Sequence, residues 1–378
     1  HIAYATGFSQ TVKYGRCASN CGLPSSWTFI DIDTQSATGT MTNARMAVAT
    51  DGRLHVVYEK YENSSDLTFY ATCASSCTQA ASWQKVDLTS LLGNSRGAYR
   101  SMPIVVDSAG RVSFITNELS SGGNVYLTTC GANCTTLTNW QSGIIRQGGL
   151  RIAMAANGTT LHAIVNDEAS RLHYSSCVSN CTQSASWTES SYLFVHDGTM
   201  PTAIAVAPGG RVIVAYNQGS TDPGEPANIQ AQANKILVWQ CDTNCTDPMS
   251  WSGVILGADR DGDEGIKILE LGGAEVLAFT NTLTFRAGVC TSNCTNSANW
   301  QFADIDSNQA MASDLDPYTV FLCGGTRPVF SAWYPDEGVV AISPTTGEAV
   351  FAHAPYGLKT CNVNPMRDAS MLRLIYSP

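Results

Sequence analysis

Short apolar runs alternate with polar turns along the chain, at the spacing typical of β-strands. The apolar run at 46–49 is followed by the turn Asp51-Gly52-Arg53 and by a second apolar run at 54–58. Asp-Gly between two apolar runs is a strong hairpin signal. Further strands predicted at 67–70 and 83–88 complete a unit of four antiparallel strands. The same order recurs with apolar runs at 104–106, 152–155, 172–174 and 212–216, and with turns at 109–111, 157–158, 209–211 and 272–273.

A cysteine–tryptophan motif lies between the third and fourth strands of this unit. Two cysteines are separated by three residues, and a tryptophan follows the second cysteine after five more residues. The six copies are Cys17–Cys21–Trp27, Cys73–Cys77–Trp83, Cys130–Cys134–Trp140, Cys177–Cys181–Trp187, Cys241–Cys245–Trp251 and Cys290–Cys294–Trp300. A fixed local unit repeated at intervals of roughly fifty residues indicates a repeat architecture.

These repeats predict an all-β fold, a seven-bladed β-propeller formed by residues 1–378 as a single domain, with six blades as the alternative. A seventh blade without the motif is predicted from strands at 318–321, 328–333, 339–342 and 349–352. The first motif is preceded by only two strands. We therefore expect the tail at 371–376 to supply the missing inner strand, so that the two chain ends close the ring and leave no exposed edge.

The fourteen cysteines, six pairs plus Cys323 and Cys361, predict disulfides and an oxidising, extracellular location, secreted or at the cell surface. Cys323 and Cys361 lie at the two ends of the predicted seventh blade. The alternative is zinc, but the next cysteine pair lies a whole repeat away and no histidine recurs beside the motif. Four Asn-Cys-Thr sequences inside the motif match the N-glycosylation pattern because the repeat itself produces them.

The net charge argues against nucleic acid as a partner, and the hydropathy argues against a transmembrane segment. The formal net charge is −10, and no basic stripe is present to neutralise phosphates, so nucleic acid is not expected as a partner. No run of 18 apolar residues exists, so no transmembrane segment is predicted. The sequence opens with His1, as expected of a mature chain after signal-peptide removal.

The position of the motif resembles that of the Asp-box in sialidase-like (BNR) propellers. In those blades S-x-D-x-G-x-x-W forms the turn before the fourth strand, and its tryptophan opens that strand. Here the C-x3-C-x5-W repeat takes this place, while no true Asp-box and no R-I-P motif is present. The resemblance implies that the motifs are structural and that a functional site lies on the opposite face, formed by the loops between the second and third strands and between blades. Those loops vary most here, and variable loops on a rigid scaffold commonly carry function.

One candidate group on that face is cationic. Arg45, Arg100, Arg151 and Arg367, with Lys267, lie near the starts of inner strands. Arginine offers forked donors suited to a carboxylate or sulfate, and the resemblance implies a similar cluster that grips an acidic sugar. Alternatively, these cations pair with Asp and Glu and tie loops together.

A second group combines acids and aromatics. Its candidate catalytic residues are Tyr58, Glu59, Glu118 and Asp167, and its candidate ligand-binding residues are Tyr61, Trp333 and Tyr334. Paired carboxylates supply acid and base for glycoside hydrolysis, and tyrosine serves as nucleophile or base. Aromatic rings also stack on sugars without catalysis. The alternative is a set of solvated loop residues.

A calcium site is a third candidate. Asp259, Asp261, Asp263 and Glu270 echo the ligand spacing of an EF-hand loop, but Glu264 replaces the glycine required at the sixth position. The alternative is an ordinary acidic turn. His1, His55 and His162 occupy equivalent repeat positions and are interpreted as structural histidines.

The leading functional prediction is a carbohydrate-recognising propeller, lectin-like or adhesive, that binds a glycan or polysaccharide through its loop face. The alternatives are a sialidase-like hydrolase or polysaccharide lyase acting on acidic glycans, and a protein–protein scaffold in an extracellular assembly. Pockets repeated between blades would favour the lectin. One central pocket lined by Arg45, Arg100 and Arg151 would favour the enzyme, and a large exposed apolar patch the scaffold.

Overall fold

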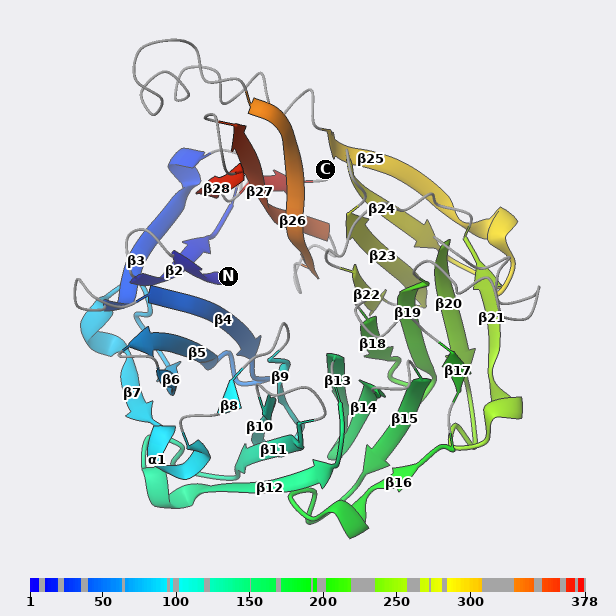
Figure 1. The fold of residues 1–378 in the computed structure, drawn as a ribbon, viewed down its shortest axis with the longest axis horizontal. Helices are drawn as coiled ribbons and strands as arrows, with labels where there is room; N and C mark the ends of the chain where they lie inside the picture. Colours follow the sequence, from blue (N-terminus) through cyan, green and yellow to red (C-terminus); the bar gives the residue numbers. More distant parts are fainter. Residues whose placement is uncertain are drawn as a thin grey trace. The chain divides into compact units, whose positions relative to one another are not determined.

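The chain folds into seven antiparallel β-sheets in two compact units (Figure 1). The first unit comprises residues 1–198 and 243–250, and the second comprises 199–242 and 251–378. The computed structural model describes residues 1–6, 11–19, 24–34, 40–62, 65–93, 96–97, 102–118, 123–149, 151–167, 171–191, 193–195, 202–218, 235–256, 266–271, 273–280, 284–307, 330–342, 349–360, 365–370 and 373–376.

Four sheets belong to the first unit. They are β1 (Ile2–Thr6), β2 (Thr11–Cys17) and β3 (Trp27–Thr34); β4 (Thr40–Val48), β5 (Leu54–Glu62), β6 (Ser65–Cys73) and β7 (Gln84–Asp87); β8 (Arg96–Gly97), β9 (Ile104–Val106), β10 (Val112–Glu118), β11 (Val125–Cys130) and β12 (Trp140–Arg146); and β13 (Arg151–Asn157), β14 (Thr160–Asn166), β15 (Arg171–Cys177), β16 (Thr188–Glu189) and β17 (Phe194–Val195). A single-turn helix, α1 (Thr89–Leu92), follows β7.

Three sheets belong to the second unit. They are β18 (Thr202–Val206), β19 (Val212–Gln218), β20 (Lys235–Cys241) and β21 (Ser252–Ile255); β22 (Ile266–Leu271), β23 (Ala274–Thr280), β24 (Thr284–Cys290) and β25 (Gln301–Ser307); and β26 (Phe330–Ile342), β27 (Ala349–Thr360), β28 (Pro365–Ser370) and β29 (Arg373–Tyr376). The predicted unit of four antiparallel strands is therefore confirmed in five of the six repeats that carry the motif, all but the first.

The number of complete sheets fits the alternative of six blades better than seven. Six described sheets have four or five strands, whereas the sheet β1–β3 has three. The predicted ring closure by the chain ends is wrong. β29 pairs antiparallel with β27, from Val350 opposite Tyr376 to His353 opposite Arg373. It occupies the part of the β27 edge that β28 leaves unpaired, so the nearest open edge captures the tail.

The predicted seventh blade also folds differently from the expectation. Strands predicted at 328–333 and 339–342 are one strand, β26, paired with β27 as a long hairpin. Pro335 and Asp336, expected to lie in a loop, pair with Pro355 and Ala354, and the register shifts only between Asp336 and Val339. A bulge of this kind absorbs extra residues without ending the strand. The predicted strand at 318–321 and Cys323 and Cys361 lie outside the described residues.

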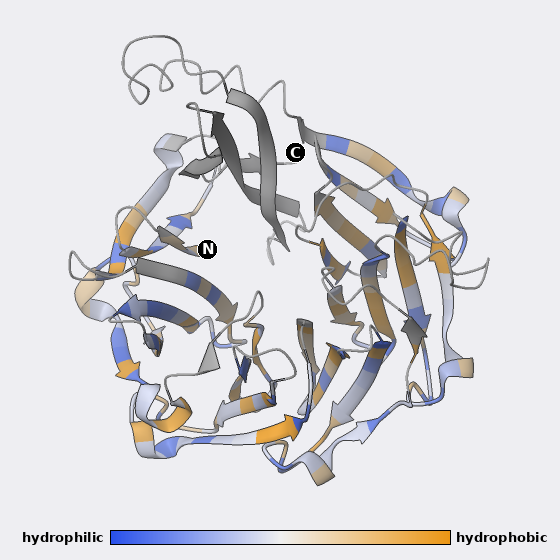
Figure 2. Cartoon of the chain, in the orientation of Figure 1, coloured by the Kyte–Doolittle hydropathy of each residue, from blue (hydrophilic) through white to orange (hydrophobic). Residues whose placement is uncertain are grey.

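Neighbouring sheets within each unit bury a hydrophobic core between their faces. In the first unit, one core packs Val57 and Tyr70 against Phe114 and Trp140. In the second unit, the core between β18–β21 and β22–β25 contains Ile213, Leu277 and Phe279. Second strands such as β10 and β19 are therefore buried along almost their whole length; β19 is mainly apolar, whereas β10 also buries Ser113, Thr116 and Asn117. Figure 2 shows the contrast with outer strands such as β7 and β16, which are mainly hydrophilic.

The cysteine–tryptophan motif forms the same compact loop wherever it is described. Bonds join Cys73 to Cys77, Cys130 to Cys134, Cys177 to Cys181 and Cys290 to Cys294; Cys17, Cys241 and Cys245 are also disulfide-bonded. The predicted disulfides are thus confirmed for these positions, while Cys21 lies outside the described residues. A short 3₁₀ turn follows, for example η3 (Leu137–Asn139).

A backbone dihedral angle and a hydrogen bond explain two residue choices in the loop. The residue before the second cysteine has a positive φ, 52° at Asn133 and 53° at Asn180. Asparagine tolerates this left-handed conformation better than most residues, so backbone geometry accounts for the Asn-Cys-Thr sequences. The indole Nε1 of Trp140 donates to the carbonyl of Cys134 at 2.9 Å, and that of Trp83 donates to the carbonyl of Cys77 at 2.9 Å.

The motif also joins one sheet to the next. The ring of Tyr70, on β6, lies 4.9 Å from that of Trp140 in an edge-to-face arrangement. Tyr14 and Trp83 repeat this contact at 5.2 Å. Aromatic pairs of this geometry add to the stabilisation from burial. The motif therefore serves as packing, as predicted from its repetition.

No described helix is long and apolar enough to cross a membrane.

Candidate functional site

Two predicted catalytic residues on β5 are buried in the first unit. Tyr58 is fully buried, and its hydroxyl donates to Asp33 Oδ2 at 2.7 Å. Burial and the neighbouring Asp33 carboxylate raise the pKa of Tyr58 above its ordinary value. Glu59 is 2% exposed and accepts a hydrogen bond from Asn43 at 2.9 Å. These contacts hold both side chains in the scaffold, and a catalytic role for either stays a prediction.

Asp33 is the centre of that network. Lys60 and Lys85 approach its two carboxylate oxygens at 2.6 and 2.8 Å. Burial alone would raise the pKa of Asp33, but the hydrogen bonds from Lys60, Lys85 and Tyr58 outweigh it and lower this pKa. The ionised carboxylate thus links β3 to the neighbouring sheet.

Asp167 lies in a second, denser network in the first unit. Its Oδ2 is 2.9 Å from His173 Nε2 and 3.1 Å from Arg171 Nε. Glu189 approaches the other ring nitrogen of His173 at 3.3 Å and also pairs with Arg146. Burial opposes ionisation of Asp167, but the bonds from His173 and Arg171 prevail and lower its pKa. A histidine held between two carboxylates, with two arginines beside them, is a balanced charge cluster.

Glu118 is half-buried at the end of β10. It accepts hydrogen bonds from Tyr126 Oη at 2.6 Å and from the backbone and side chain of Asn124 at 3.2 Å. Each described carboxylate predicted as acid or base therefore has protein donors. The structure places Glu118, Glu59 and Asp167 in three separate networks.

The predicted arginine cluster is only partly described. Arg45, on β4, is half-buried, and its Nη1 donates to the carbonyl of Ala44 at 3.1 Å. Arg151 opens β13 and Arg367 lies in β28, but their side chains are outside the description, as is the whole of Arg100. Lys267 is exposed on β22. A central pocket lined by these cations stays a prediction.

Of the aromatic residues predicted to bind a ligand and the acids predicted to bind calcium, the structure likewise describes only some. Tyr61 is 43% exposed on β5, whereas only the backbone of Trp333 and Tyr334 in β26 is described. Asp259, Asp261 and Asp263 lie outside the described residues. Glu270 belongs to β22 and accepts a hydrogen bond from the Gly273 backbone at 2.7 Å. Within the described residues no group of three or more His, Cys, Asp or Glu side chains is arranged to hold a metal ion.

The equivalent histidines have structural partners. The Nδ1 atoms of His1, His55 and His162 lie 2.6, 2.5 and 2.8 Å from the hydroxyls of Tyr14, Tyr70 and Tyr174. Burial lowers the pKa of His55 to about 4, aided by nearby Arg53, and burial lowers that of His162 to about 4. These hydrogen bonds, together with the neutral imidazoles of His55 and His162, agree with the interpretation of the three histidines as structural residues.

A polar pocket of about 190 Å³ lies at the cysteine-loop end of the first unit, between the sheets β8–β12 and β13–β17. It is lined by Arg111, Thr129, Gly131, Asn139, Gln141, Leu161, Asn180, Cys181 and Thr182. The third sheet therefore contributes one wall and the cysteine loop of the fourth sheet contributes the other, with Leu161 as an apolar surface.

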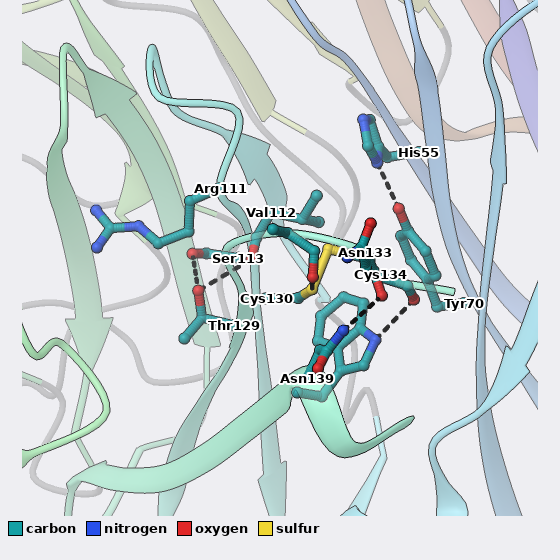
Figure 3. Close-up of a disulfide and its surroundings, with 12 residues drawn as sticks. His55, Tyr70, Arg111, Val112, Ser113, Thr129, Cys130, Asn133, Cys134 and Asn139 are labelled. Atoms are coloured by element: carbon teal, nitrogen blue, oxygen red, sulfur yellow. Dashed lines mark hydrogen bonds between the residues drawn. A yellow bond between two sulfur atoms is a disulfide. The ribbon is translucent and has the colours of Figure 1, made fainter. Parts of the chain in front are cut away.

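Several pocket side chains are fixed by the scaffold (Figure 3). Arg111 Nη2 donates to the carbonyl of Thr159 and pairs with Asp107, both at 2.8 Å. Thr129 Oγ1 donates to the carbonyl of Val112 at 3.0 Å. Asn139 Nδ2 donates to the carbonyl of Asn133 at 3.1 Å. Such bonds pre-position the polar groups, which reduces the entropic cost of binding a ligand.

No protein-family model matches the chain. No curated protein matches it either. Among solved structures, a protein of unknown function from Dyadobacter fermentans is similar, with a TM-score of 0.53 at 10% identity over 90% of this chain and 95% of that one. A likeness at this identity concerns the fold alone.

Two further solved structures have TM-scores below 0.5. A variant of the Aleuria aurantia lectin, solved with Fucα1-6GlcNAc, has a TM-score of 0.47 at 11% identity and covers 88% of this chain and 94% of its own. A Trypanosoma rangeli sialidase variant with trans-sialidase activity has a TM-score of 0.46 at 11% identity, covering 91% and 60%. Neither likeness bears on the function of this chain.

The pocket residues were not predicted from the sequence. They belong to the cysteine loops, to the turn before a second strand and, for Thr129, Gln141 and Leu161, to the strand ends beside them, all interpreted as scaffold. One signal was available in the turns: arginine recurs at the same place in Arg53, Arg111 and Arg211, directly after the turn glycine. Of these three, Arg111 donates to Thr159 of the next sheet, whereas Arg53 pairs with Asp51 in its own turn and Arg211 pairs with Asp242 of its own sheet.

Proposed function

We propose that this chain is a carbohydrate-binding β-propeller of six complete blades, extracellular and lectin-like. The observation that supports it is the polar pocket between the sheets β8–β12 and β13–β17. Its guanidinium, amide and hydroxyl groups supply both donors and acceptors, which a sugar's hydroxyls require. Its volume of about 190 Å³ is below the roughly 300–1,000 Å³ of sites for drug-sized ligands, and suits a ligand of about one sugar ring.

The proposed site lies at the cysteine-loop end, whereas the sequence favoured the opposite loop face. The described carboxylates of the loop face accept hydrogen bonds from neighbouring protein donors, which gives little support to an acid–base pair for catalysis. The polar pocket gives more support to binding. Recognition by the loop face stays a prediction, because most of those loops lie outside the described residues. The disulfides in five of the six motifs support an oxidising compartment.

Isothermal titration against a panel of neutral monosaccharides and short glycans tests the proposal. Gln141 is an exposed pocket residue on β12, so Gln141→Ala should weaken binding at least about fivefold, the loss of roughly one hydrogen bond. Thr188→Ala is the matched control, because Thr188 is exposed and follows Trp187 as Gln141 follows Trp140 but does not line the pocket. If the two variants bound every glycan with equal affinity, the pocket that contains Gln141 would not be the binding site.

Mass spectrometry of the same mixtures separates binding from catalysis. We expect sialylated, uronic-acid and neutral glycans to remain intact. Released sugar or an unsaturated uronate would instead support the hydrolase or lyase alternative, and the arginine group would become the first target for substitution.

A further inference from the structure

One repeat in the second unit places an acid where the other described repeats have an apolar residue. The residue opposite the first cysteine of the motif is Leu54, Val112, Leu161 or Val212 in four sheets, but Glu275 in the sheet β22–β25. Glu275 is only 2% exposed. A carboxyl group in an apolar, buried position is costly, and local violations of this kind are commonly found at functional sites.

The register gives Glu275 the same place as a residue of the polar pocket. Leu161 forms the apolar surface of that pocket, and Thr129 and Arg111 come from the preceding sheet. Their equivalents here are Glu275 itself, Gln240, which directly precedes Cys241, and Arg211, which directly precedes Val212. The junction between β18–β21 and β22–β25 thus repeats the pocket positions with different chemistry.

Only half of the Glu275 carboxylate is satisfied. Gln240 Nε2 donates to Oε1 at 2.6 Å, whereas Oε2 has no hydrogen-bond partner within the described residues and is buried. An acceptor in this state requires a donor. Arg211 does not supply it in this structure: its Nε donates to Asp242 Oδ1 at 2.8 Å, and none of its nitrogens bonds Oε2.

The surrounding charge favours a cationic donor. The ionisable groups acting on Glu275 are Arg211 and Glu270, and Asp242 pairs with Arg211. Glu270 lies directly opposite Glu275 on β22. Three acids therefore surround one base. A protonated amine offers up to three donors and no acceptor, so it satisfies Oε2 and offsets the excess negative charge.

We propose that this junction is a second sugar-binding position that selects a ring carrying a protonated amino group, with Glu275 as its anionic acceptor. The proposal rests on the proposed carbohydrate function and names a ligand class for one of its positions. Desolvation by burial raises the pKa of Glu275 to about 7, against the lowering effect of Arg211 and Gln240. Binding of an ammonium ion requires the ionised form, so affinity should fall as the pH falls below 7.

The test compares glucosamine with N-acetylglucosamine by isothermal titration of the full chain at pH 7 and pH 5. The wild type should prefer glucosamine about tenfold or more at pH 7. That preference should fall about tenfold at pH 5, because only a small fraction of Glu275 is then ionised. Glu275→Gln, which keeps an acceptor and the size of the side chain, should abolish the preference at both values of pH.

Two outcomes would overturn the proposal: no preference for glucosamine in the wild type, or a preference that Glu275→Gln retains. Thr188→Ala, an exposed change outside both binding positions, is the control and should leave the preference unchanged. Loss of neutral-sugar binding in Gln141→Ala supports the general carbohydrate proposal, whatever the amine result. The failure of either proposal is therefore distinguishable from that of the other.

Discussion

Gly143 shows how closely two sheets approach at a single residue. A Cβ atom at this position of β12 would lie 2.0 Å from the carbonyl oxygen of Thr182, in the cysteine loop of the next sheet. Backbone atoms move less readily than a flexible side chain, so the absence of a side chain here permits the packing. Glycine occupies the hairpin turns for a different reason. Gly110 and Gly210 have φ values of 77° and 91°, which glycine adopts without strain.

Gly143→Ala should therefore lower the free energy of unfolding by about 1–3 kcal/mol, the usual cost of overpacking. Urea denaturation would measure this change. Gly131→Ala is the matched control, because a Cβ atom there meets nothing within 4 Å and its φ is not positive. Equal effects of the two substitutions would show that the contact with Thr182 does not determine stability.

Glu275 makes stability depend on pH. Its pKa in the folded chain is raised by burial from 4.5 to about 7, so the folded state binds the proton more tightly than the unfolded state. Stability is then highest below pH 4.5 and falls as the pH rises to about 7. Glu275→Gln should match the wild type near pH 4.5 and exceed it at pH 8 by up to about 3 kcal/mol.

Thermal unfolding of both proteins across pH 4.5–8 checks that expectation. Asp51→Asn is the control, since Asp51 is an exposed acid of the first unit and is not among the groups that act on Glu275. A constant difference between Glu275→Gln and the wild type at every pH would mean that Glu275 titrates equally in the folded and unfolded states.

At the scale of the element, the cysteine loop is stabilised in three ways. The bond between Cys73 and Cys77 closes a very short loop, Ser76 has a φ of 54°, and the indole of Trp83 donates to the carbonyl of Cys77. The sequence predicted the disulfide bond and the structural role of the tryptophan. The left-handed residue was not predicted, although asparagine at four of the equivalent positions is explained by it.

Replacing Cys73 and Cys77 together with serine should lower the free energy of unfolding by about 2 kcal/mol, the chain-entropy value for so short a loop. Chemical denaturation under oxidising conditions gives the measurement. Ser75→Ala, an exposed change in the same loop, should have almost no effect. If the double variant retained full stability, the hydrogen bond from Trp83 and the backbone turn would hold the loop without sulfur.

At the scale of the whole molecule, the chain ends decide which strands are paired. The tail pairs with β27 through four residues. Deleting residues 371–378 should therefore increase hydrogen exchange at Val350–His353, because these residues lose their partners on that edge. Exchange in β1 should not change.

Hydrogen exchange read by mass spectrometry separates this arrangement from the predicted one. If the tail completed the first sheet, the deletion would instead increase exchange at Ile2–Thr6. Deleting residues 377–378 alone is the control, because both follow β29.

The sequence alone determined the fold class, the repeat unit, the hairpin turns and the role of the cysteine–tryptophan motif. These are local properties, because alternation of apolar and polar residues, turn glycines and cysteine spacing act over a few residues. Tertiary structure alone decided which edge receives the tail, that Pro335 and Asp336 pair with β27 ahead of a bulge, and that Glu59, Glu118 and Asp167 accept hydrogen bonds from different protein donors. It also created the polar pocket and the half-satisfied Glu275, since both depend on side chains from two adjacent sheets. Contacts between residues far apart in sequence arise only when the sheets pack, so no local pattern encodes them.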